Sequence, residues 1–230
     1  MAVNFNGPYY LMRLLLPHFR EQRSGCVLNI ASRAGTVAIP YSTSYCASKA
    51  ALINLTACTQ REMDVEGLDD VHLYSLHPGG IKSAMTLNST DPSNPLFHFP
   101  HPPFSYRRQH QSTPLTPHPT TSEYSKDSVA TLPLQAHAFF ANTLDIYNDS
   151  PYLNGMVCVA LATGVGKRAL RGKYFDVGQD LEDVLAQEDT LRANPDLYGL
   201  HTSFLGELTN AGLPPGGYHA EEVKFEFPGF

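Results

Sequence analysis

The chain has 230 residues, of which 42% are hydrophobic and 17% are charged, and its formal net charge is −6. That length and composition suit one globular domain with a sizeable core, so we expect a single domain over residues 1–230. The acidic balance disfavours nucleic acid and anionic membranes as partners, because both repel a negatively charged surface.

Membrane insertion and metal binding are also disfavoured. The longest apolar run, residues 156–162, is too short to span a bilayer. The apolar stretch "YYLMRLLLPHF" contains Arg13 and follows no basic segment, unlike a signal peptide, so we expect a cytoplasmic protein. The four cysteines lack CxxC or zinc-site spacing, and there is no HExxH motif. We therefore expect reduced cysteines and no metal site.

The first predicted elements are a helix and a strand. Leucines recur at helical spacing over residues 5–22, where Pro17 predicts a kink. Residues 26–32, "CVLNIAS", form a short apolar run between turn signals, which is typical of a strand buried on both faces of a parallel sheet.

A second helix and a second strand follow. Ser42 or Thr43 is expected to cap a long helix that ends near Glu66, just before a glycine. Residues 71–80 predict a strand that is interrupted by Pro78. Strand, helix and strand in this order predict a right-handed crossover and therefore an α/β fold with a parallel sheet.

The second half of the chain is less regular. Residues 86–126 are rich in proline, serine, threonine and histidine and predict an irregular lid or insert. A helix is predicted over residues 128–145, and residues 156–163 are ambiguous between helix and strand. Residues 172–178 predict a strand, and residues 179–197 predict a helix that opens with an acidic first turn.

Polar side chains gather where the predicted strands end, which is where ligands bind in parallel α/β folds. Ser32 ends the first strand, and the glycine-containing turn 78–83 ends the next one. Tyr45 and Lys49 lie one helical turn apart on the same face of the helix between them. A phenol beside a fixed cation releases its proton more readily, so the pair is suited to proton transfer. Each residue alone has a structural interpretation, but together they favour a catalytic site.

Five motifs occur in the order expected of one enzyme family. They are "VNFNG", "NIASRAG", "YCASK", "PGGIKS", with serine where threonine is usual, and "LRGKYFDVG". The chain thus resembles the C-terminal part of the short-chain dehydrogenase/reductase family outside about 87–127. The resemblance implies a partial Rossmann-like, doubly wound parallel sheet with an irregular lid. It implies catalytic roles for Asn4, Ser32, Tyr45 and Lys49, and cofactor contacts by Tyr45, Lys49, Pro78, Gly79, Ile81 and Ser83.

The chemistry that the resemblance implies is hydride transfer between NAD or NADP, with NADP preferred, and an alcohol or carbonyl substrate. Tyr45 would transfer the proton, and Lys49 would assist it and hold the nicotinamide ribose. Ser32 would hydrogen-bond the substrate oxygen. Asn4 would anchor a water that links Lys49 to solvent; it is preferred to Asn6 because only Asn4 has a glycine three residues later.

The family's glycine-rich TGxxxGxG motif does not occur in this sequence, so we expect a chain that lacks the N-terminal, pyrophosphate-binding half. A late "GVGKRA" matches GxGxxA. We reject it as a phosphate loop because Gly172 interrupts the helix that it would open, and the following residues fit the final strand.

The leading interpretation is an oxidoreductase, with a fungal-looking tail that suggests secondary metabolism. The alternative is a non-catalytic remnant that acts as a dimerisation module. In either case the resemblance implies a homo-oligomer formed through the helices at 6–22 and 42–66. A serine hydrolase using Ser32 and His77 is disfavoured, because there is no GxSxG motif and the tyrosine–lysine pair would be unexplained.

Overall fold

The computed structural model describes residues 1–83, 86, 139, 142 and 146–202. By their contacts the residues form two units, one of Met1–Gly79 with Asp149–Phe230 and one of Gly80–Asn148. The single domain over 1–230 stays a prediction. The expected lid at 86–126 and helix at 128–145 lie outside the described residues, apart from Thr86, Phe139 and Asn142.

The described sheet lies in the first unit and has three parallel strands in the order β1, β2, β3. They are β1 (Gly25–Ile30), β2 (Val71–His77) and β3 (Tyr174–Asp176). The register pairs Ile30 with Leu76 and Leu76 with Phe175. This arrangement confirms the predicted α/β class with a parallel sheet. The first strand ends two residues earlier than predicted, because Ser32 already caps the turn that follows.

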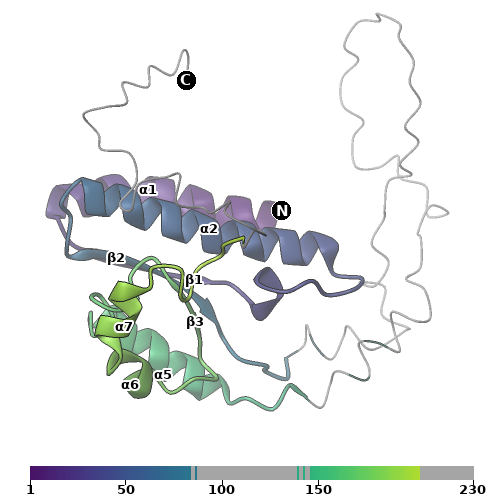
Figure 1. The fold of residues 1–230 in the computed structure, drawn as a ribbon. Helices are drawn as coiled ribbons and strands as arrows, with labels where there is room; N and C mark the ends of the chain where they lie inside the picture. Colours follow the sequence, from purple (N-terminus) through teal and green to yellow (C-terminus); the bar gives the residue numbers. More distant parts are fainter. Residues whose placement is uncertain (84–85, 87–138, 140–141, 143–145, 203–230) are drawn as a thin grey trace, which may run out of the picture. The chain divides into compact units, whose positions relative to one another are not determined.

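Two long helices, α1 (Gly7–Gln22) and α2 (Thr43–Val65), lie side by side over one face of the sheet (Figure 1). A π-helical turn, η1 (Ala2–Asn6), precedes α1, and Pro17 lies inside α1 as predicted. Ser42 occupies the N-cap position of α2, although its side chain makes no capping hydrogen bond.

The opposite face is covered by α5 (Pro151–Ala162), α6 (Leu181–Leu185) and α7 (Glu188–Ala193) (Figure 1). The ambiguous residues 156–163 thus fall in a helix, which begins where the Ser150 hydroxyl accepts a hydrogen bond from the Tyr152 amide. The single helix predicted over 179–197 is wrong, because the chain forms two short helices with a break between them. In the described part of the chain, no helix has the length and apolarity needed to cross a membrane.

Strand β2 separates two hydrophobic clusters because its side chains alternate between the faces of the sheet. Val71 and Leu73 pack with residues of α1 and α2, whereas Tyr74 and Leu76 pack with residues of α5 and β3. These four side chains are fully buried. Burial on both faces explains why apolar side chains of this strand point to either side of the sheet.

β3 pairs only with the last part of β2. The side chain of Gln60, on α2, forms hydrogen bonds with the backbone of β2 before that part. The Leu73 amide donates to Oε1 of Gln60 at 2.7 Å, and Nε2 of Gln60 donates to the Val71 carbonyl at 3.2 Å. Gln60 is 2% exposed. Its carboxamide therefore satisfies two buried backbone groups that would otherwise be costly to bury.

Candidate active site

Tyr45 and Lys49 lie in the first turns of α2, beside the carboxyl end of β1. The Lys49 ammonium donates to the carbonyl oxygen of Ile30 at 2.7 Å and lies 5.7 Å from the centroid of the Tyr45 ring. Partial burial lowers the pKa of Lys49. The helix thus brings the phenol and the amine together at the end of the strand, as the four-residue spacing predicts.

Ser32 follows β1 directly and is 8% exposed. It caps a short 3₁₀ turn, Arg33–Gly35, in which the Ala34 amide donates to Oγ of Ser32 at 3.1 Å. This bond uses a lone pair of the hydroxyl and leaves its proton to donate elsewhere. A serine held in this way is suited to donate to an oxygen atom of a ligand.

The turn that carries Ser32 packs directly on the backbone of α2. A Cβ atom added to Gly35 would lie 2.8 Å from the carbonyl carbon of Lys49 and 2.9 Å from the Ala50 nitrogen. Such distances are shorter than real Cβ contacts, so this position requires glycine. The close approach fixes Ser32 relative to Lys49.

Asn4 lies in the π-helical turn before α1 and contacts α2 through a serine. Its Nδ2 atom donates to Oγ of Ser48 at 3.4 Å, and Ser48 donates to the Tyr45 carbonyl oxygen at 2.7 Å. Asn4 and Lys49 also line a common cavity of about 430 Å³ between α1 and β1. The structure therefore brings Asn4, Tyr45, Lys49 and the turn of Ser32 together around the start of α2.

Pro78 and Gly79 follow β2 in the same unit, and Gly79 has a φ of +90°, which favours glycine. A Cβ atom at Gly79 would lie 2.9 Å from Oδ2 of Asp149. Just before this turn, burial lowers the pKa of His77, an effect that Asp176 opposes. The imidazole is therefore held in its neutral form more firmly than a free histidine.

Ile81 and Ser83, the remaining predicted cofactor contacts, belong to the second unit. There the Ser83 amide donates to Oγ1 of Thr86 at 2.8 Å, and the same hydroxyl donates to the Ile81 carbonyl at 3.3 Å. These bonds form a compact polar turn within that unit. The cofactor roles of Ile81 and Ser83 stay predictions.

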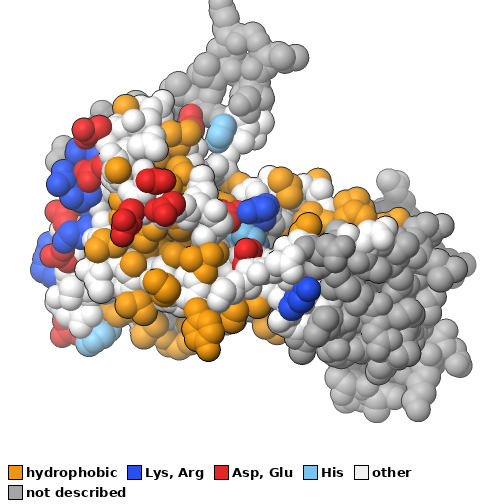
Figure 2. All heavy atoms as spheres, turned by 90° about the horizontal axis from the view of Figure 1, so that it is seen from below, with side chains coloured by type: hydrophobic (Ala, Val, Ile, Leu, Met, Phe, Trp, Pro, Cys, Tyr) orange, Lys and Arg blue, Asp and Glu red, His pale blue; other side chains and the backbone are white. Residues whose placement is uncertain are grey.

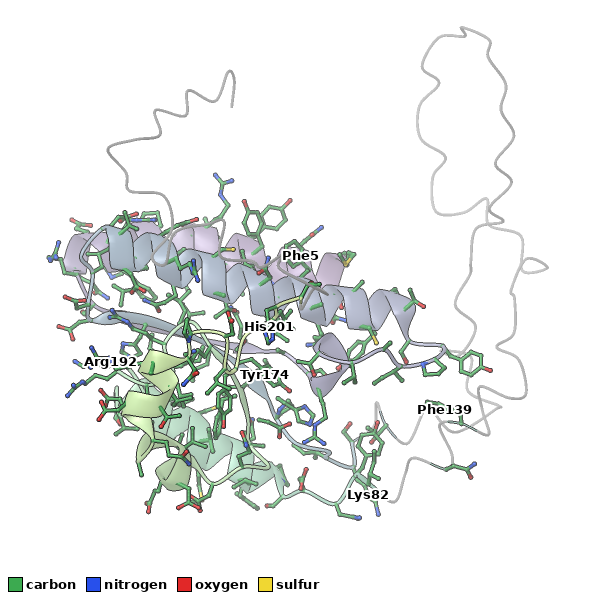
Figure 3. The ribbon with its side chains drawn as sticks, viewed as in Figure 1. Phe5, Lys82, Phe139, Tyr174, Arg192 and His201 are labelled. Atoms are coloured by element: carbon green, nitrogen blue, oxygen red, sulfur yellow. The ribbon has the colours of Figure 1, made fainter. Side chains whose placement is uncertain are left out.

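The sequence reasoning missed an ion pair at the carboxyl end of the sheet. Arg33 donates to Oδ2 of Asp176 through Nε at 2.9 Å and through Nη2 at 2.6 Å. The pair joins the turn after β1 to the end of β3, the strand that begins at Tyr174 (Figure 3). The only signal in the sequence is that a charged residue directly follows Ser32 and another ends the last strand.

Parts of the chain are similar to known dehydrogenases. Residues 1–94 match the family model described as short chain dehydrogenase. A short chain dehydrogenase of Pseudocercospora fijiensis is 27% identical over 81% of this chain and 48% of its own length. Dehydrogenase/reductase SDR family member 7B of Danio rerio is 35% identical over 39% of this chain and 28% of its own.

Two solved structures were also compared. A 4-hydroxyisoleucine dehydrogenase mutant complexed with NADH and succinate is 36% identical, with a TM-score of 0.34, over 37% of this chain and 34% of its own. A short-chain dehydrogenase from Streptomyces avermitilis is 22% identical, with a TM-score of 0.45, over 85% of this chain and 57% of its own.

The structure gathers a tyrosine, a lysine and a serine at the carboxyl edge of a parallel α/β sheet. Over residues 1–94, the chain is similar to the short-chain dehydrogenase family. The chain covers 48% of the length of the Pseudocercospora fijiensis relative and 28% of the length of the Danio rerio relative.

Proposed function

We propose that the protein is an oxidoreductase that interconverts an alcohol and a ketone or aldehyde with NAD or NADP. Its catalytic residues would be Asn4, Ser32, Tyr45 and Lys49. One observation carries the proposal. The Lys49 ammonium lies 5.7 Å from the centroid of the Tyr45 ring, beside the carboxyl end of β1. A proton donor next to a cation at this edge of a parallel sheet is suited to reactions at a substrate oxygen.

The residues of the chain would divide the reaction between them. A bound nicotinamide cofactor would supply or accept the hydride. Tyr45 gives its hydroxyl proton to the carbonyl oxygen in reduction and takes it back in oxidation. Ser32 donates a hydrogen bond to the same oxygen, which stabilises the negative charge that develops there.

Lys49 and the turn after β2 would hold the cofactor. The lysine uses one of its three N–H donors on Ile30, which leaves two for a ribose hydroxyl and for Tyr45. Pro78 and Gly79 follow the neighbouring strand, where a turn with little side-chain bulk lets a ring approach the backbone. Asn4 lines the same cavity as Lys49, which supports its role in a proton route to solvent.

Replacement of Tyr45 by phenylalanine tests the proposal. The change removes one hydroxyl, so we expect turnover to fall at least about 100-fold with the fold unchanged, because the general acid–base group is lost. Oxidation of secondary alcohols and reduction of ketones would be followed by nicotinamide absorbance, with NADH and with NADPH. Tyr41→Phe, outside α2, is the matched control. Undiminished activity of Tyr45→Phe would disprove the assignment, whereas a wild-type chain that neither binds cofactor nor turns over favours the dimerisation module.

A further inference from the structure

Lysine and arginine side chains pair with acidic side chains at several places on this molecule. Figure 2 shows the two kinds of charge side by side on the face that carries α5. An exposed pair such as Lys167 with Asp70, just before β2, contributes little to stability, because solvent screens its charges. The pair of Arg33 and Asp176 differs in its position. It lies at the carboxyl edge of the sheet, where Arg33 directly follows Ser32.

The pair of Arg33 and Asp176 spans the end of the middle strand. β1 and β3 are not neighbours, because β2 lies between them, so the Arg33 side chain crosses the end of β2 to reach Asp176. His77, the last residue of β2, responds to both charges. Burial lowers the pKa of His77, and beyond this effect Asp176 raises it while Arg33 lowers it. The pair therefore ties the turn after β1 to β3 across the point where Pro78 follows β2.

Asp176 is a fixed anchor for the arginine. Its side chain is 15% exposed, its Oδ1 atom accepts from the Gly178 amide at 3.0 Å, and its Oδ2 atom accepts both bonds from Arg33. A Cβ atom added to Gly178 would lie only 3.1 Å from Oδ1 of Asp176, so the backbone is packed closely around the carboxylate. The Arg33 side chain is 62% exposed. The carboxylate is thus held by its own surroundings, and it in turn holds the arginine.

At its other end, Arg33 belongs to the same compact turn as Ser32. The Arg33 carbonyl accepts from the amide and from the hydroxyl of Thr36, both at 2.9 Å, and the Ser32 carbonyl accepts from the Gly35 amide at 2.9 Å. These local bonds make residues 32–36 one piece. Gly35 packs this piece on α2, and the Arg33 side chain attaches it to β3.

We propose that Arg33 is a positioning residue, which acts through its pair with Asp176 to hold the Ser32 hydroxyl at the substrate oxygen. This inference rests on the proposed function, in which Ser32 donates to that oxygen. Without the attachment to β3, the turn could rotate about its contact at Gly35 and carry the hydroxyl with it. A displacement of about 1 Å in a reacting group can lower a rate by about 100-fold.

Substitutions of the two partners test the proposal. We expect Arg33→Met and Asp176→Asn each to lower kcat by about 10-fold, and the double variant to fall no further, because all three lose the same pair. The KM for the cofactor should not change, since Lys49 and the turn after β2 are proposed to hold it. Arg33→Lys can still place a charge at the carboxylate and should keep most of kcat.

Lys167→Met and Asp70→Asn are the matched controls, because they remove an exposed pair at the other end of β2. They should leave kcat unchanged. Denaturant unfolding distinguishes positioning from loss of the fold, and Arg33→Met and Lys167→Met should have similar midpoints. If Arg33→Met lost stability together with turnover, and Arg33→Lys did not restore turnover, the pair would be structural and the proposal would be wrong.

A second measurement does not require turnover. Ser32 is 8% exposed, so the thiol of Ser32→Cys should react slowly with iodoacetamide, as followed at that residue by mass spectrometry. Adding Arg33→Met should raise this rate by about 10-fold, because the turn then opens more often. Equal alkylation rates, or an unchanged kcat in an active enzyme, would overturn the proposal. A wild type without turnover in which the two rates still differ would reject the oxidoreductase function but support the attachment of the turn through Arg33.

Discussion

Lys49 is the residue on which most of the candidate site depends. Its ammonium contacts the end of β1, the ring of Tyr45 and the cavity that Asn4 lines. Burial lowers its pKa, yet the hydrogen bond to Ile30 holds the amine in place. One side chain thus connects Tyr45, the end of β1 and the cavity.

Replacement of Lys49 by methionine should therefore affect two measurements together. We expect kcat to fall by about 100-fold and the dissociation constant of the cofactor to rise, because one ammonium serves both the proton transfer and the ribose. Steady-state kinetics and cofactor titration would measure the two effects.

Lys167→Met is the control for this change, because Lys167 forms an ion pair with Asp70 away from the candidate site. It should leave both kcat and cofactor affinity unchanged. A fall in kcat for Lys49→Met with unaltered cofactor affinity would show that the contact with the ribose is wrong.

The candidate residues themselves could be found from the sequence, because spacing along one helix determines which side chains are neighbours. Tyr45 and Lys49 are the example. The pairing of Arg33 with Asp176 could not be found, since 143 residues separate the partners and only the folded sheet brings them together. Local patterns hold no information about such a contact.

Among the elements, the turn after β1 positions the site most directly. Gly35 lets this turn lie against α2 at Lys49 and Ala50. Gly35→Ala should push the turn away from the helix, because the added methyl group would meet backbone atoms that cannot rotate aside. We expect a loss of about 1–3 kcal/mol in the free energy of unfolding, as for other overpacked sites, together with reduced turnover.

Denaturant unfolding and steady-state rates would measure these two effects. Gly7→Ala is the control, because its added Cβ would meet only the Ala2 carbonyl oxygen, at an ordinary 3.8 Å. If Gly35→Ala were as stable and as active as Gly7→Ala, the turn would not be held by its contact with α2.

The periodicity of the sequence predicted whether a segment is a strand or a helix more reliably than it predicted where that segment ends. The apolar run of residues 26–32 predicted a strand buried on both faces, but β1 is only partly buried and Ile30 is 41% exposed, whereas β2 is buried on both faces. The acidic segment after β3 was expected to form one helix but forms α6 and α7. Asp180 caps the first of these by accepting from the Glu182 and Asp183 amides, and the chain turns at Gln187 before the second begins.

At the scale of the whole molecule, stability should depend on pH through buried histidine. Burial lowers the pKa of His72, and nearby Asp70 offsets this effect only partly. Lys167 and Arg171 lower it further. Between this lowered value and the ordinary value of 6.5, the unfolded chain binds more protons than the folded chain. The free energy of unfolding should therefore fall as the pH drops below about 6.5.

Denaturant unfolding from pH 8 to pH 5 measures how the free energy of unfolding changes with pH. This range spans about 1.5 units on either side of the ordinary histidine pKa. His72→Gln should make the slope shallower, and His77 contributes in the same direction because burial lowers its pKa too. His201→Gln, at an exposed position, is the control and should leave the slope as in the wild type. If the wild type, His72→Gln and His201→Gln had equal slopes, the pH dependence would come from other groups.

The carboxamide of Gln60 has a mechanical consequence. It bonds Val71 and Leu73 of β2 from a helix that carries Tyr45 at its other end. For α2 to slide along the sheet, both buried bonds would have to break with no water to replace them. We therefore expect α2 and β2 to move together. A thermal displacement of α2 that moves the Tyr45 hydroxyl would also move the end of β2, just before Pro78.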